Sequence, residues 1–79
     1  MFLEIITPEK KVYEGEINSV QLPGSEGSFQ ILNNHSPIVS TLKKGNAVIV
    51  NTNNEKQAIE LSGGVVEVNG NHIIVLAEA

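Results

Sequence analysis

The chain has 79 residues and a mass of 8.5 kDa, which is enough for one small domain and no more. It contains no cysteine, so disulfide bonds, thiolate metal clusters and a cysteine nucleophile are all excluded. Nine Glu against five Lys, without any Asp or Arg, give a net charge of −4. This balance argues against binding to nucleic acid and against direct adhesion to an anionic membrane surface.

The sequence also lacks the usual features of a targeted chain. No basic leader with a small-residue cleavage site follows Met1. The longest apolar run, residues 73–77, is far shorter than the roughly 20 residues that a transmembrane helix needs. We therefore expect a cytosolic chain.

The apolar residues are mostly β-branched. Nine Val and nine Ile outnumber six Leu and four Ala. Val and Ile lose rotamer freedom in a helix and pack well on a pleated sheet. With nine Asn, seven Gly and three Pro available for turns, the composition favours an all-β fold.

Short segments of alternating apolar and polar residues follow one another along the whole chain, separated by turn-forming residues. They predict strands at residues 3–7, 12–15, 17–22, 28–32, 38–42, 47–50, 58–61, 65–68 and 73–76. No segment repeats apolar residues at helical spacing. We predict a single domain over residues 1–79, a small β-sandwich of about nine to ten short strands in two packed sheets.

The alternation also assigns faces within the strands. Leu3, Ile5 and Thr7 share a face, as do Val20 and Leu22, and Phe29 and Ile31. Between the last two strands, Asn69-Gly70 predicts the central pair of a type I′ hairpin turn. Residues 23–27 predict a loop of turn-forming residues.

The residues needed for catalysis are missing. Neither a nucleophile-elbow motif nor a phosphate-binding loop is present. His35 and His72, without Cys or Asp, are too few for a convincing zinc site. Glu14 and Glu16 alternate along a strand and are expected on a solvated face. We expect no catalytic residue, metal or cofactor.

His35 lies in a polar loop between Asn34 and Ser36. Two interpretations remain open from its spacing. Its ring nitrogen caps loop carbonyls, or its side chain contacts a partner, since loops carry function more often than the strands they connect.

Several spaced motifs resemble the epsilon subunit of the F-type ATP synthase. They are the turn Gly24-Ser25-Glu26-Gly27, the loop ending in His35-Ser36-Pro37, the turn Lys43-Lys44-Gly45, the strand entry Leu61-Ser62-Gly63-Gly64 and the strand exit Val75-Leu76-Ala77. The motifs occur in the family's order and the resemblance spans nearly the whole chain. Asn33-Asn34 stands where the family usually has Pro-Gly, and Asn tolerates the positive φ that such a turn needs.

The resemblance implies a non-catalytic subunit at the foot of the central stalk, peripheral to the cytoplasmic face of the membrane. Such a subunit joins the gamma subunit to the membrane rotor ring and couples ion flow to ATP synthesis. The implied rotor-ring contacts are Ser25, Glu26, Gly27 and Ser28, and the implied gamma-subunit contacts are His35, Ser36, Pro37, Ser40 and Leu42. Direct lipid insertion and nucleotide binding are not expected of this domain.

Typical family members continue past the last strand with a helical hairpin, whereas this chain stops at Ala79. The family's ATP-binding motif and its brake on hydrolysis lie in that hairpin, so neither role is carried over to this chain.

Two other classes fit an acidic all-β chain of this length. A lipoyl- or biotinyl-carrier domain presents one modified Lys at a hairpin tip, and Lys43-Lys44-Gly45 is such a tip. The carrier signatures Met-Lys-Met and Asp-Lys-Ala are absent there. A sugar- or peptide-binding module needs aromatic platforms, for which Phe2, Tyr13 and Phe29 offer little.

Overall fold

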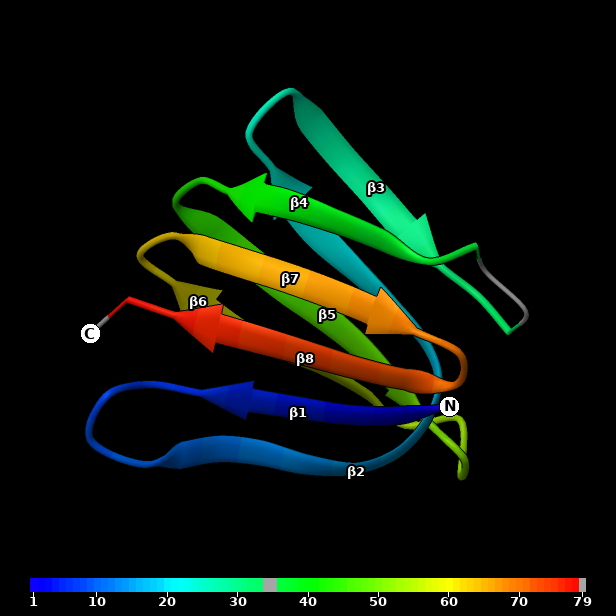
Figure 1. Cartoon of the computed structure of the whole chain (residues 1–79). Helices are drawn as coiled ribbons and strands as arrows, with labels where there is room; N and C mark the ends of the chain where they lie inside the picture. Colours follow the sequence, from blue (N-terminus) through cyan, green and yellow to red (C-terminus); the bar gives the residue numbers. More distant parts are fainter. Residues whose placement is uncertain (34–35, 79) are drawn as a thin grey trace.

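The computed structural model describes residues 1–33 and 36–78. In this part of the chain the secondary structure consists of strands and turns, so the predicted all-β class is confirmed (Figure 1). Eight strands follow one another: β1 (Phe2–Ile6), β2 (Lys11–Gly24), β3 (Gly27–Ile31), β4 (Ile38–Leu42), β5 (Gly45–Asn51), β6 (Lys56–Leu61), β7 (Gly64–Asn69) and β8 (His72–Ala77).

The long strand β2 replaces two strands that the sequence predicts separately. The glycine at position 15 does not end the strand, because Gly15 pairs with Leu3 and Glu16 pairs with Phe2 in the antiparallel ladder with β1. A register shift between Ile17 and Ser19 then bends the chain onto β5. The described residues therefore form eight strands, and β2 belongs to both layers of the sandwich.

The pairings define two layers. The first sheet contains the start of β2, then β1, β8, β7 and β4, and the second sheet contains β3, the end of β2, β5 and β6. β1 and β8 run parallel, while the other neighbours are antiparallel. Besides β2 itself, one residue pair among those described, Gly24 with Leu42, joins the two sheets. The strands thus form one continuous hydrogen-bonded sheet, which folds back on itself to make the two layers (Figure 1).

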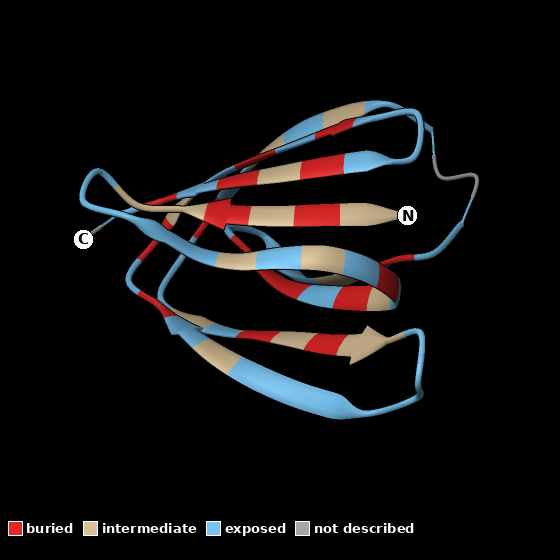
Figure 2. Ribbon diagram, turned by 90° about the horizontal axis from the view of Figure 1, so that it is seen from below, coloured by how far each residue is buried: buried red, intermediate tan, exposed pale blue. Residues whose placement is uncertain are grey.

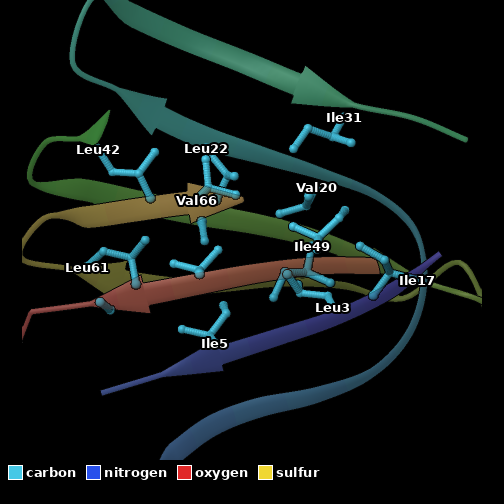
Figure 3. Packing of buried hydrophobic residues seen from close by; sticks show 14 of the residues in the cluster. Leu3, Ile5, Ile17, Val20, Leu22, Ile31, Leu42, Ile49, Leu61 and Val66 are labelled. Carbon is cyan, nitrogen blue, oxygen red and sulfur yellow. The ribbon is translucent and has the colours of Figure 1, made fainter. Parts of the chain in front are cut away.

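The core lies between the layers. Alternate residues along the strands are buried, as the banding in Figure 2 shows, and their side chains meet between the sheets in Figure 3. Every buried side chain of the described residues is apolar. The predicted shared faces are confirmed for Leu3 with Ile5, for Val20 with Leu22 and for Phe29 with Ile31, where Phe29 packs half-buried against the core. Thr7 lies beyond β1. The core comprises Leu3, Ile5, Ile17, Val20, Leu22, Ile31, Leu42, Ala47, Ile49, Leu61, Val66, Val68, Ile73, Val75 and Ala77.

Two turns depend on glycine. Gly70 has φ of +63°, and the central pair of the β7–β8 hairpin is Gly70-Asn71, because Asn69 pairs with His72. Only the first central residue has positive φ, as in a type II′ turn, so the predicted type I′ turn at Asn69-Gly70 is wrong in both its central pair and its type. At the first residue of β7, after the turn at Ser62-Gly63, Gly64 has φ of +147°, and a Cβ there would collide with the carbonyl oxygen of Leu76.

Candidate interaction surfaces

The turn predicted to contact the rotor ring is the tip of the β2–β3 hairpin. Pro23 and Gly24 belong to β2 and are buried, so the loop is shorter than the sequence predicts. Gly24 pairs with Gly27, which leaves Ser25 and Glu26 as the two turn residues. The four predicted contact residues, Ser25, Glu26, Gly27 and Ser28, are all exposed and adjacent.

This hairpin tip is fastened to the end of β4. The backbone N–H of Ser25 donates to the carbonyl oxygen of Thr41 at 3.0 Å, and the N–H of Lys43 donates to the carbonyl oxygen of Pro23 at 2.9 Å. Within the hairpin itself, a Cβ at Gly24 would lie 2.5 Å from the carbonyl oxygen of Gly27 and 2.8 Å from the ring of Phe29, so glycine is needed there for the close packing against β3. We call these two hydrogen bonds the tip clamp. The tip clamp joins the tip to the strand that the sequence predicts to face gamma.

The residues predicted to contact gamma differ in how far they are exposed to solvent. His35 lies outside the described residues. Ser36 and Pro37 are exposed, Ser40 is half-buried opposite the buried Val66, and Leu42 is 6% exposed and belongs to the core. Ser40 and Leu42 therefore share the inner face of β4.

The outward side chains of β4 are Val39 and Thr41. They lie at one side of an apolar face on the outside of the first sheet, formed also by apolar residues of β1, β7 and β8. Val39 is 71% exposed, Leu76 57% and Val65 37%, which are high values for large apolar side chains. We call this surface the apolar face; it consists of Ile6, Val39, Thr41, Val65, Ile74 and Leu76.

The apolar face is hollowed. A groove of about 670 Å³ is lined by residues of β1, β4, β7 and β8, among them Ile6, Val65 and Leu76. A neighbouring hollow of about 400 Å³ is lined by the same three residues together with Val39, Ile74 and Glu67. Sequence reasoning missed this surface. Its signal was the consecutive apolar pairs in strands, such as residues 5–6, 65–66 and 73–74, which place apolar side chains on both sides of a sheet.

The charges on this side of the first sheet are unevenly paired. The ammonium of Lys11 lies 2.7 Å from a Glu14 carboxylate oxygen and 3.9 Å from one of Glu4. The hydrogen bond to Glu14, together with the charges of Glu14 and Glu4, raises the pKa of Lys11. His72 Nε2 lies 3.7 Å from the same Glu4 carboxylate, and its ring packs edge-on against Phe2. Glu4 thus has two side chains that can carry positive charge, Lys11 and His72, within 4 Å, while its cross-strand neighbour is the carboxylate residue Glu14.

The outside of the second sheet has another character. Gln21 pairs with Val48, and Val48 pairs with Ala58, across three strands whose inward neighbours are core residues. On the same side Asn46 lies opposite Glu60. Val48 and Val50 of β5 are half-buried on this side, and the other side chains named here are polar or small and exposed, so the described outer surface of the second sheet is more polar than the apolar face.

Neither a metal centre nor a membrane span is found in the described residues. Within 1–33 and 36–78, no three His or Glu side chains gather where they could hold an ion. The same residues contain no helix long and apolar enough to cross a bilayer.

Solved structures share this fold. The chain superposes with a TM-score of 0.89 on a chain of the Euglena gracilis mitochondrial ATP synthase, seen with OSCP, F1 and the c-ring, at 18% identity; the match covers 95% of this chain and 48% of that one. It superposes with a TM-score of 0.82 on a chain of the Tetrahymena thermophila mitochondrial ATP synthase central stalk and c-ring, at 20% identity, covering 100% and 63%. At these identities the likeness establishes the β-sandwich fold.

Sequence comparison establishes the family. Residues 1–79 match the family model described as ATP synthase, Delta/Epsilon chain, beta-sandwich domain. The chain is 41% identical over 76 residues to the ATP synthase epsilon chain of Chlorobaculum tepidum, covering 96% of this chain and 86% of the relative. It is 40% identical to the epsilon chain of Helicobacter acinonychis, of which it covers 61%.

The chain therefore belongs to the delta/epsilon-chain β-sandwich family of ATP synthases, and the resemblance drawn from its motifs is confirmed. Membership also decides against the carrier-domain alternative, whose tip lysines Lys43 and Lys44 lie exposed in the β4–β5 turn.

Proposed function

We propose that this chain is a non-catalytic subunit of the ATP synthase central stalk, joining the gamma subunit to the membrane rotor ring. It would act at the cytoplasmic side of the membrane, without inserting into lipid and without binding nucleotide. The observation that carries the proposal is the arrangement of two unlike surfaces on one rigid sandwich. The apolar face and the exposed Ser25-Glu26 tip are held together by the tip clamp.

The gamma subunit takes the apolar face and the adjoining loop in this proposal. Apolar side chains such as Val39 and Leu76 are of little use to a free domain, because they stay in water without contributing to the core. A partner that covers them gains the hydrophobic free energy of their burial. Exposed Ser36 and Pro37 extend this contact along the loop before β4, and His35, which precedes them in the sequence, is a further gamma contact in this proposal. Ser40 and Leu42 support it from the inner side of the strand.

The rotor ring takes the hairpin tip. Ser25, Glu26, Gly27 and Ser28 present backbone and small polar groups around one carboxylate. A basic loop residue of the ring would pair with Glu26. Because that ion pair lies at the rim of a contact, it would fix the register of the tip on the ring more than it would add affinity.

Torque is transmitted through this chain without any chemical step. The two backbone hydrogen bonds of the tip clamp tie Ser25 and Pro23 to the end of β4, whose outward residues belong to the apolar face. A load applied at the tip therefore reaches the gamma-facing sheet through backbone rather than through flexible side chains. This is what a wedge between a rotating ring and a stalk requires.

The test is a pull-down of the affinity-tagged chain from detergent-solubilised membranes of its own host, read by mass spectrometry. The wild-type chain is expected to recover gamma together with the ring. Glu26→Lys is expected to reduce recovery of the ring while gamma stays bound. Glu60→Lys, an equal charge reversal on the second sheet, is the control and is expected to recover both.

Circular dichroism of the same variants keeps the test decisive. If Glu26→Lys unfolds, Glu26 is a structural residue and its contact role is lost. Failure of the wild-type chain to recover any synthase subunit would overturn the proposed function as a whole.

A further inference from the structure

One carboxylate lies within the apolar region of the first sheet. Glu67 points outward from the middle of β7, paired with Val39 of β4 on one side and with Ile74 of β8 on the other. It lines the 400 Å³ hollow together with residues of the apolar face. It also lines a second hollow of about 300 Å³, beside Pro37 and Val39. Figure 1 shows β4, β7 and β8 as neighbours on one side of the sandwich.

The outward carboxylates of β2 have ion pairs, Glu14 with Lys11 and Glu16 with the N-terminal ammonium, and the outward carboxylate of β1, Glu4, is also compensated. Lys11 and His72 lie within 4 Å of it. Glu67, by contrast, has no ion pair or side-chain hydrogen bond with any residue in 1–33 and 36–78, and it is exposed to solvent. In the free chain, water solvates this carboxylate.

A partner that covers the apolar face would remove that water. An ionised carboxylate that is desolvated without a partner strongly opposes binding. The cost is offset when the covering surface brings a cation that hydrogen-bonds the carboxylate. A purely apolar partner surface would therefore be rejected at this position, and a surface with one basic side chain would be selected.

We propose that Glu67 is a specificity determinant of the gamma-facing surface and pairs with a Lys or Arg that gamma presents within an otherwise apolar patch. This inference rests on the proposed function, since it assigns the apolar face to gamma. It adds the chemistry of gamma's contacting surface and names the residue of this chain that reads it.

The experiment measures binding of the full chain to purified gamma by isothermal titration calorimetry at low and high salt. Glu67→Gln keeps the size of the side chain and removes its charge. It is expected to weaken binding about 30-fold at low salt, because a buried basic group of gamma would lose its partner. The salt dependence of binding is expected to become shallower.

Two further variants complete the design. Glu60→Gln removes a carboxylate from the opposite side of the sandwich and is expected to change affinity less than twofold. Glu67→Lys is expected to abolish binding, and substitution of the contacting basic residue of gamma by Glu is expected to restore it. Thermal unfolding of all three variants is expected to match the wild type, since both positions are exposed.

The outcomes separate this inference from the proposed function. If wild type binds gamma and Glu67→Gln binds as tightly as Glu60→Gln, the role of Glu67 is overturned while the assignment of the face to gamma stands. If wild type does not bind gamma, both fall. If sedimentation instead shows a dimer of this chain that Glu67→Gln dissociates, the partner is a second copy and the proposal of gamma is overturned.

Discussion

The outward side chains of the two sheets differ in polarity, although both sheets bury alternate residues along their strands. Both sheets send alternate residues into one shared core. On the outside of the first sheet the remaining positions are filled by residues such as Val39, Ile74 and Leu76. On the outside of the second sheet the corresponding positions hold residues such as Asn46, Gln21 and Ala58.

Core formation explains only the inward set. A small domain that served no partner would gain solubility from polar residues on both outer surfaces, as the second sheet has them. The exposed apolar side chains therefore mark the outside of the first sheet as the surface that a partner would cover. Three variants, each with a second variant as its control, test this contrast between the sheets and are ordered from the largest expected effect to the smallest.

Gly64→Ala should have the largest effect on stability, about 3 to 4 kcal/mol. The added Cβ would collide with backbone of β8 at a φ of +147°, which an L side chain rarely adopts. Because the sheets share one core, both should lose protection together in hydrogen exchange, with a single unfolding transition in urea. Protection retained in β5 and β6 alone would show that the sheets are separable, and the contrast would then be between two units.

Gly70→Ala is the matched control for that variant. Gly70 also has positive φ, but a Cβ there meets nothing within 4 Å. Only the backbone strain of about 1 to 2 kcal/mol should remain. Equal losses in the two variants would show that the close approach at Gly64 has no energetic weight.

Leu76→Gln should act on binding rather than on folding. Its side chain is 57% exposed on the apolar face, so the free energy of unfolding should change by less than about 0.5 kcal/mol. Affinity for gamma should fall about tenfold, since apolar area at the contact is lost. Ala58→Gln, on the second sheet, should leave affinity unchanged; a similar loss there would remove the distinction between the surfaces.

Lys11→Met should have the smallest effect. The hydrogen bond from the Lys11 ammonium to Glu14 raises its pKa above 10.5, so its contribution to stability is present below that pH and is lost as the pH rises through the folded-state pKa. The difference in Tm between wild type and Lys11→Met should be small at neutral pH and vanish in alkali. In the Glu14→Gln variant, the Lys11 pKa measured by NMR should fall back toward 10.5; an unchanged pKa would contradict the assigned cause.

Much of the fold could be predicted from the sequence because a half-buried strand shows alternating apolar and polar residues. Residues 38–42 form β4 as predicted, and Val20 and Leu22 are buried while Gln21 is exposed. The sequence predicted two strands in place of β2 because glycine is a common strand-ending residue and stands at position 15. In the structure the backbone of Gly15 pairs with Leu3, and the strand continues. Pairing with a distant segment is not encoded locally.

The interaction surfaces were harder to predict. Motif matching identifies a segment but does not identify which of its two faces meets a partner, and a step of one residue reverses the face. Ser40 and Leu42 were predicted to contact gamma, but their side chains lie on the inner face of β4. The side chains exposed on the outer face are those of Val39 and Thr41. The tip, where four consecutive residues are all exposed, carries no such ambiguity.

The tip clamp has an evolutionary consequence. Both of its hydrogen bonds use backbone N–H and carbonyl groups, from Ser25 to Thr41 and from Lys43 to Pro23. The side chains of Ser25, Thr41 and Lys43 are exposed and take no part in these bonds. Substitution at these positions can alter the chemistry of the tip surface without moving its backbone. Related chains can therefore vary the exposed side chains of the tip while keeping its position relative to β4.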